Sequence, residues 1–255
     1  RRVQNDLWAI KNRIDAAQLL TTSFANYLMI QPDINQKRFS DFARLTLLNS
    51  NYLQAIEWVP RINNKDAYEK VARKDFAEYL IKELANDHSN QFSPAGNRSE
   101  YFPIRFVEPE IDNAMMVGYD LSSNPDRQQT LRAAFQSNAS LMTAPIKLIQ
   151  TNQQQSGILI YAPVQQNKQF LGFALSVVNL EKLFQSVNLH KHVYYQLTIN
   201  DITNPRNIRH VFTYQDPKSY NPRNNYRVDY SRQVKLGGRI WEVNAVSRSE
   251  ERRVG

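Results

Sequence analysis

The sequence lacks cysteine and is poor in glycine and proline. With no cysteine among its 255 residues, it excludes a disulfide framework, a thiol nucleophile and a thiolate metal site. Only 7 glycines and 11 prolines leave little room for flexible linkers. It also lacks a signal peptide and any apolar run near the roughly 18 residues of a membrane span. We therefore expect a folded globular piece excised from a longer protein, with 248–255 as a tail that is not native.

Sequence signatures of catalysis are also missing. There is no Gly-x-Ser-x-Gly elbow, phosphate-binding loop or dinucleotide fingerprint. Glu108, Glu110 and Asp112 cluster as in a solvated turn, and nothing marks them as an acid–base pair. His190 and His192 alternate, as two residues on one face of a strand do, but they lack a third metal ligand, so a loop is the default interpretation. We expect no enzyme activity, no cofactor and no metal in this chain.

Basic residues outnumber acidic ones and give a formal charge of +8. Most of the excess lies in 181–255, which holds 13 Lys and Arg against 7 Asp and Glu. Such a face binds nucleic acid, lies against a negatively charged membrane, or is simply solvated. The basic residues stand singly, without the cluster or stacking motif of a nucleic-acid module, so we expect no nucleic-acid partner.

The N-terminal segment has the clearest periodicity. Its apolar positions alternate at spacings of four and three, which is the a/d pattern of a heptad repeat. A continuous helix over this segment would be roughly 40 Å long. The pattern fits an amphipathic helix packed on its own domain, but so narrow and regular a stripe favours a helix–helix seam in a dimer stalk. The stripe consists of Val3, Leu7, Ile10, Ile14, Ala17, Thr21, Phe24 and Leu28.

The rest of the chain alternates helical patterns with short strands. Strands that come in runs, with the helices set apart, predict an α+β fold with antiparallel sheets. We expect one sheet in 50–178 and a smaller one from about 190 to 246, with a hairpin turn at 165–169. The expected helices are 35–48, 65–84, 125–135 and 179–187. The expected strands are 52–59, 101–107, 157–164, 170–177, 194–199, 210–214, 226–234 and 240–246.

Six motifs occur in a fixed order along this pattern. They are AIEWVPRI (55–62) with YE (68–69), YFPIRFVEP (101–109), GYDL (118–121), NPDR (124–127), API (144–146) and APV (162–164). In this order they resemble the CHASE domain, the extracellular sensor of plant cytokinin receptors and of many bacterial histidine kinases and nucleotide cyclases. The core resemblance covers about residues 40–180. LGGRIWEV (236–243) also resembles the family's final strand, which runs into the second transmembrane helix.

The resemblance implies a long stalk helix followed by two PAS-like antiparallel-sheet subdomains. We expect stalk and connecting helices in 1–48, the membrane-distal ligand-binding subdomain in 49–180, and a linker with the membrane-proximal subdomain in 181–247. It further implies a homodimer through the N-terminal helix, on the periplasmic or extracellular side of a membrane to which flanking helices tether it. The output, a histidine kinase or a diguanylate or adenylyl cyclase, would lie beyond this chain.

Seven residues are candidates for ligand binding by the same resemblance. Asp126 matches an aspartate that accepts hydrogen bonds from an adenine-type ligand in the plant receptors, since an ionised carboxylate can accept two N–H donors. An acidic residue is also favoured in the first turn of a helix by the dipole alone. Thr143 matches a position where a bulkier side chain spoils the pocket, and Ile149 one whose backbone meets the ligand. Tyr161 replaces a smaller polar residue and either donates a hydrogen bond or fills the cavity. The remaining wall would be Ile104, Met116 and Leu121, which core packing explains equally well.

Two functions fit these observations. The first is a sensor that binds a small molecule in the distal sheet and passes the signal to a cytoplasmic kinase or cyclase. The alternative is a structural or partner-binding module of the same fold, in which the pocket has collapsed and no small ligand binds.

Overall fold

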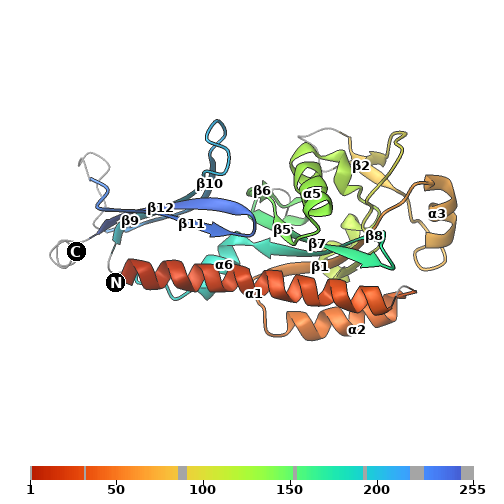
Figure 1. Ribbon diagram of the computed structural model, residues 1–255, viewed down its shortest axis with the longest axis horizontal. Coiled ribbons are helices and arrows are strands. Elements are labelled where there is room, and N and C mark those ends of the chain that lie inside the picture. The colour runs from red at the N-terminus through yellow and green to blue at the C-terminus, as the bar shows by residue number, and fades with distance from the viewer. Residues whose placement is uncertain are drawn as a thin grey trace.

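Two antiparallel sheets lie one after the other along a single long helix (Figure 1). The computed structural model describes residues 2–31, 33–85, 91–151, 154–191, 194–218 and 227–247. The predicted α+β class is confirmed, as is the antiparallel pairing of both sheets. The tail at 248–255 and His192 lie outside the described residues. Within the part of the chain that is described, no helix is both long and apolar enough to span a bilayer.

Helix α1 (Arg2–Ile30) packs against both sheets. The stripe residues from Val3 to Leu28 are each at most 7% exposed, because they face the sheets of their own chain. The polar member of the stripe, Thr21, donates to the carbonyl of Ala17, and its hydroxyl is also hydrogen-bonded to that of Ser176, both at 2.7 Å. The interpretation of this stripe as a dimer seam is therefore wrong, and the helix is amphipathic and packs on its own domain.

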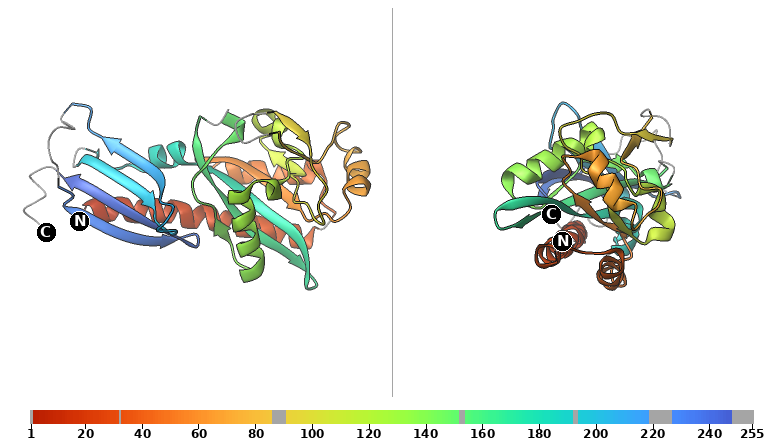
Figure 2. Two further views of the ribbon diagram at one scale, coloured as in Figure 1. Left: turned by 90° about the horizontal axis from the view of Figure 1, so that it is seen from above. Right: turned by 90° about the vertical axis from the view of Figure 1, so that its right-hand side faces the viewer.

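The six-stranded sheet forms the larger part of the molecule. Its order is β4-β1-β8-β7-β5, and β6 pairs with the beginning of β7. Helix α1 and helix α2 (Gln36–Leu47) cover one face, and α5 (Pro125–Ser137) lies on the other (Figure 2). Its strands are β1 (Leu53–Pro60), β4 (Phe106–Glu108), β5 (Leu141–Met142), β6 (Ile146–Lys147), β7 (Ser156–Gln166) and β8 (Gln169–Asn179).

Two expected elements are shorter than their patterns suggest. The helix expected over 65–84 ends at Ala72 (α3, Lys65–Ala72), because the chain turns back where the Glu69 carboxylate accepts the amide of Ile81 at 2.9 Å. The strand expected at 101–107 is continuous only as β4, from Phe106, and before it Tyr101 and Pro103 form isolated antiparallel bridges with Ile62 and Asp120. A small hairpin of β2 (Lys82–Leu84) and β3 (Phe92–Pro94) covers this region. Short helical turns are α4 (Glu110–Asn113), η1 (Ala114–Met116), η2 (Leu121–Ser123) and η3 (Ile149–Thr151).

The four-stranded sheet follows helix α6 (Leu180–Ser186) and has the order β10-β9-β12-β11. The strand expected at 226–234 begins at Tyr230, and 219–226 lie outside the described residues. The tip between β11 and β12 touches the larger sheet, where the amide of Met142 donates to the carbonyl of Gly237 at 2.9 Å. Gly237 has a φ of +57°, and a Cβ there would lie 2.5 Å from Met142, so the close approach requires glycine. The strands are β9 (Tyr194–Asp201), β10 (Arg209–Gln215), β11 (Tyr230–Leu236) and β12 (Arg239–Ser247).

Candidate functional site

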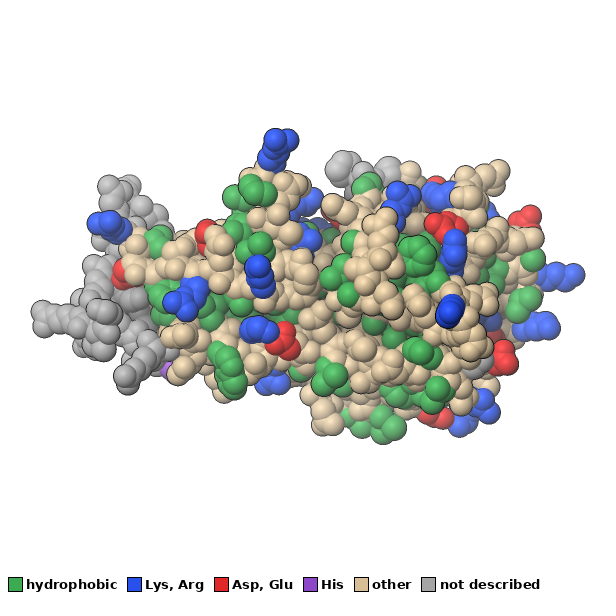
Figure 3. Space-filling view, viewed as in Figure 1, with side chains coloured by type: hydrophobic (Ala, Val, Ile, Leu, Met, Phe, Trp, Pro, Cys, Tyr) green, Lys and Arg blue, Asp and Glu red, His purple; other side chains and the backbone are tan. Residues whose placement is uncertain are grey.

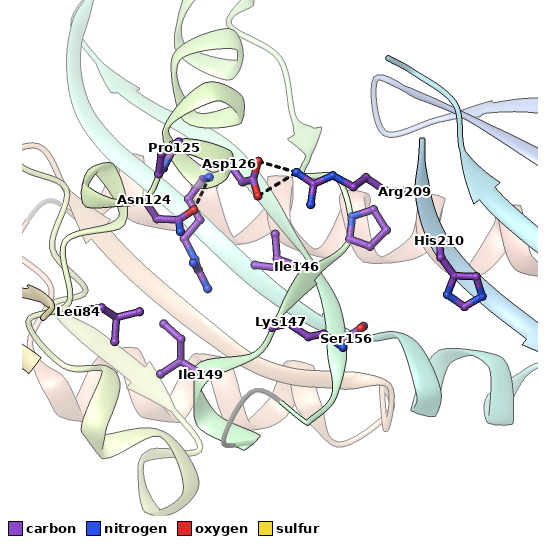
Figure 4. Close-up of a pocket in the computed structure, with 12 residues that line it drawn as sticks. Leu84, Asn124, Pro125, Asp126, Ile146, Lys147, Ile149, Ser156, Arg209 and His210 are labelled. Atoms are coloured by element: carbon purple, nitrogen blue, oxygen red, sulfur yellow. Dashed lines mark hydrogen bonds and ion pairs between the residues drawn. The ribbon is translucent and has the colours of Figure 1, made fainter. Parts of the chain in front are cut away.

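A groove of about 520 Å³ lies where the two sheets meet (Figure 4). This volume is within the range of small-molecule sites. We call it the junction groove, because its walls come from the beginning of α5, from β6 and η3, and from the beginning of β10. The residues that line it are Leu84, Asn124, Pro125, Asp126, Arg127, Pro145, Ile146, Lys147, Ile149, Ser156, Arg209 and His210.

Local sequence fixes Asp126 at the mouth of this groove. Asn124 caps α5, and its side-chain oxygen accepts the backbone N–H of Arg127 at 3.2 Å. Pro125 occupies the first helical turn, where its missing N–H costs nothing. The carboxylate of Asp126 accepts two contacts from the guanidinium of Arg209, at 3.2 and 3.4 Å (Figure 4). This ion pair joins α5 of the larger sheet to β10 of the smaller one.

The groove carries more positive than negative charge. Arg127, Lys147 and Arg209 line it, and Asp126 is the one carboxylate among its lining residues. Because Arg209 is paired with Asp126 and the charge of Arg127 acts on Glu57, Lys147 is the lining cation best placed to attract an acceptor or an anion on a bound molecule. The side chains of Arg209 and Asp126 are 37% and 43% exposed, so solvent or a ligand can compete for their contact.

Three polar side chains form a group that we call the interior polar trio: Glu57, Tyr161 and Arg127, of which Arg127 also lines the groove. Glu57 is on β1 and Tyr161 on β7, and both are opposite Leu175 of the intervening β8. They therefore lie on one face of the sheet, the face that packs against α5. Arg127 extends from α5, and its guanidinium lies 5.5 Å from the centroid of the Tyr119 ring.

The trio is almost fully buried and incompletely hydrogen-bonded. Tyr161, Glu57 and Arg127 are 0%, 1% and 5% exposed. The Tyr161 hydroxyl, one carboxylate oxygen of Glu57 and the Nε of Arg127 have no hydrogen-bond partner among the described residues. Burial raises the pKa of Glu57 to about 8, although the charge of Arg127 opposes the rise. Burial likewise raises the pKa of the Tyr161 hydroxyl.

The structure brings two of the seven predicted site residues to the groove and leaves the other five in the interior. Asp126 and Ile149 line the junction groove. Thr143 is fully buried, and its hydroxyl accepts the amide of Leu159 at 3.0 Å, so backbone bonding explains it. Tyr161 lies in the core between α5 and the sheet. The remaining predicted wall residues pack in that same core: Ile104, Met116 and Leu121.

Sequence reasoning missed Arg209, Glu57 and Arg127. Glu57 could have been noticed, because it alternates with Ala55 and Val59 on the apolar face of a strand. Arg127 lies within the NPDR motif but was given no role. Arg209 has no signal in the sequence, since its contact with Asp126 spans 83 positions and depends on how the two sheets meet.

The histidines do not form a metal site in the part of the chain that the structure describes. No group of three or more His, Cys, Asp or Glu side chains lies close enough to hold an ion there. The Nδ1 of His190 instead lies 2.6 Å from the buried carboxylate of Asp6, which also accepts the Tyr194 hydroxyl at 2.7 Å. This network fastens the beginning of α1 to the smaller sheet.

Sequence comparison finds a matching family model and several related signalling proteins. The family model of the CHASE domain matches residues 32–212. Hybrid signal transduction histidine kinase A of Dictyostelium discoideum is 27% identical over 113 residues, which are 44% of this chain and 5% of that protein. The germination-specific adenylate cyclase of the same organism is 28% identical over 108 residues, 42% of this chain and 12% of that protein. The chain thus spans a small part of these relatives.

A solved structure shares the whole fold. The ligand-binding domain of the Pseudomonas aeruginosa PAO1 amino acid chemoreceptor PctC, in complex with GABA, superposes with a TM-score of 0.52. The superposition covers 96% of both chains at 14% sequence identity. The likeness is therefore one of fold, with two sheets arranged along one long helix.

Proposed function

This chain belongs to the CHASE domain family, and we propose that it is the extracytoplasmic sensor of a transmembrane receptor that binds a small molecule in the junction groove. CHASE domains are sensor domains of histidine kinase and cyclase-type receptors, and this chain is such a domain and not an enzyme. In our proposal the longer protein carries a histidine kinase or nucleotide cyclase that responds to the ligand.

The position of the two sheets supports an orientation relative to the membrane. Helix α1 begins and β12 ends at the same end of the molecule, beside the four-stranded sheet (Figure 1). Membrane helices attached at both points would place that sheet next to the bilayer and the six-stranded sheet far from it. The lysines and arginines of the four-stranded sheet would then face anionic headgroups. On the face drawn in Figure 3 they are spread singly, which does not favour nucleic-acid binding.

Our proposal for signal transmission is based on the ion pair between Asp126 and Arg209. A ligand that hydrogen-bonds Asp126 must compete with Arg209, and Arg209 belongs to the membrane-proximal sheet. Binding would therefore loosen one contact between the ligand groove and that sheet. A ligand shifts an equilibrium only through such a difference in affinity between two arrangements.

An adenine-type molecule is the ligand candidate that the family suggests. The edge of an aminopurine presents adjacent N–H donors, as a guanidinium does, and so could replace Arg209 on the carboxylate of Asp126. Ile149 and Ile146 would supply apolar contact from the facing wall.

The test measures the melting temperature of the domain with and without each member of a panel of adenine derivatives that includes isoprenoid cytokinins. A ligand at about 100 times its Kd should add roughly 2.7 kcal/mol of stability, a shift of several degrees. The variant Asp126→Ala should lose that shift. Asp66→Ala is a matched control, because Asp66 holds the same position in the asparagine-capped α3 and is exposed.

The other outcomes separate the two functions. A shift that survives in Asp126→Ala would remove Asp126 from the site while keeping the sensor. No shift with any small molecule would favour the partner-binding module.

We also propose that the sensor dimerises through α1, but by its outward side. Trp8, Leu19 and Ile30 are 68%, 68% and 71% exposed. They are spaced by 11 residues, or about three turns, and so form one outward stripe roughly 33 Å long. A second copy anchored in the same membrane would present the same stripe in parallel, which suits a two-fold dimer. Exposed apolar rows of this kind mark protein–protein contacts.

A further inference from the structure

The interior polar trio has the composition of a recognition site. Across the sheet, Glu57 and Tyr161 are two strands apart, a separation of roughly 9–10 Å, with Leu175 between them. The space above Leu175 is covered by α5, which contributes Arg127. One carboxylate, one hydroxyl and one guanidinium thus converge on a patch that is otherwise apolar.

Packing alone does not account for these three side chains. Buried polar atoms in native proteins are nearly always hydrogen-bonded to protein or water, so a cluster of exceptions on one face of a sheet needs an explanation, and a bound ligand is one. Here one atom of each member lacks a partner among the described residues. A purely structural pair would use its hydrogen bonds on each other, yet Glu57 and Arg127 interact only through their charges.

We propose that Glu57, Arg127 and Tyr161 bind a small amphoteric ligand, which presents an amino group to Glu57 and a carboxylate to Arg127 and Tyr161. The carboxylate of Glu57 accepts hydrogen bonds from an ammonium group, whereas the guanidinium and the phenol donate to a carboxylate. Such a ligand supplies the missing partner of each member. The ammonium group favours the ionised form of Glu57, so each charge of the ligand is paired with an opposite charge of the trio.

Arg127 connects this interior to the junction groove. It is one of the lining residues of the groove and also a member of the trio. Its guanidinium rests on the ring of Tyr119, and its Nε has no hydrogen bond to break among the described residues. A rotation of this side chain would open a path from the groove to Glu57 and Tyr161. The groove then is the entrance, and the trio is the deeper end of the same site.

This inference rests on the proposed sensor function and deepens it by naming the ligand class. The experiment measures the melting temperature of the domain with the twenty L-amino acids and γ-aminobutyrate as probes. γ-Aminobutyrate is matched with butylamine, which lacks the carboxylate, and with butyrate, which lacks the amino group. We expect at least one amphoteric probe to raise the melting temperature by several degrees, and neither singly charged analogue to do so.

Variants of the trio locate the effect. Glu57→Gln and Tyr161→Phe should each lower the affinity for that probe by at least tenfold. Two controls keep the same chemical changes outside the site: Glu78→Gln at an exposed position, and Tyr230→Phe in β11, whose hydroxyl also lacks a hydrogen-bond partner within the described part of the chain. Both controls should bind as the parent does.

Each other outcome contradicts the inference in a separate way. A probe whose binding survives Glu57→Gln, or is lost only in Asp126→Ala, overturns the trio while the sensor function stands. Failure of every amphoteric probe overturns the ligand class, and the adenine panel still tests the sensor independently. In ligand-free protein, Tyr161→Phe should not lower the melting temperature; a loss of several degrees would show a structural partner for the hydroxyl and overturn its role in binding.

Discussion

Glu57 shows what a single buried carboxyl does to the stability of this domain. Its pKa is raised to about 8 by burial, above the value near 4.3 of an unfolded chain. A raised carboxyl pKa means that the folded state holds its proton longer than the unfolded state. The associated stability is complete below about pH 4.5 and is lost as the pH rises through about 8.

We predict that Glu57→Gln removes this pH dependence. Between about pH 5 and pH 9 the free energy of unfolding of the parent should fall relative to that of the variant, by at most about 4 kcal/mol. Denaturant unfolding at a series of pH values measures the difference. The exposed control Glu78→Gln should follow the parent curve, and a Glu57→Gln curve parallel to the parent would show that this carboxyl is ionised throughout.

At the residue scale the sequence foretold the candidate site only in part. Motif order led to Asp126 and Ile149, because both belong to local segments whose conformation is set by nearby residues. Whether Tyr161 fills a cavity or faces one depends on the side chains packed around it, which no local pattern encodes. The contact of Asp126 with Arg209 requires two sheets that are assembled separately along the chain.

At the scale of elements, the apolar spacing of α1 predicted the helix correctly but not the surface against which the helix packs. The alternation of three and four predicted the helix and its buried face correctly. The same stripe forms whether the opposing surface is a helix or a sheet, so the sequence could not decide between them. The hairpin of β7 and β8 was predictable because alternation and a polar turn are local signals, whereas the early end of α3 depends on a tertiary bond from Glu69 to Ile81.

The outward stripe of α1 gives a prediction for assembly. If a second copy covers Trp8, Leu19 and Ile30, then Leu19→Glu places two charges at the centre of the dimer and should lower the fraction of dimer at least tenfold. Light scattering after size-exclusion chromatography over a range of concentrations measures this. Leu48→Glu, at a leucine that is 76% exposed just after α2, makes the same change outside α1.

The Leu48→Glu control shows whether a lower fraction of dimer is specific to the outward stripe of α1. Dimerisation that is unaffected by Leu19→Glu, or is affected equally by Leu48→Glu, would contradict assembly through the outward stripe. Neither variant should alter the melting temperature of the monomer by more than about a degree, since both side chains face solvent.

At the scale of the whole molecule, three of the contacts that join the two sheets differ in how readily a ligand could break them. Helix α1 runs beneath both, the tip at Gly237 is bonded to Met142, and Asp126 is paired with Arg209. The first is a buried apolar contact and the second is a backbone hydrogen bond. The third is an exposed ion pair, with an expected stability contribution of about 0–1 kcal/mol. It is therefore the contact that a ligand can most readily break.

We predict that Asp126→Ala reproduces the effect of an occupied groove on the smaller sheet. Without its partner carboxylate, Arg209 is released, and amide hydrogen exchange in β10 should accelerate, by at most about fivefold for a contact worth up to about 1 kcal/mol. Exchange followed by mass spectrometry measures this, with Asp66→Ala as the control. Because β10 is an edge strand that pairs only with β9, it can loosen without unfolding the sheet. If its exchange stays unchanged in Asp126→Ala, the ion pair does not transmit the signal, and the rigid contacts of α1 and Gly237 must do so.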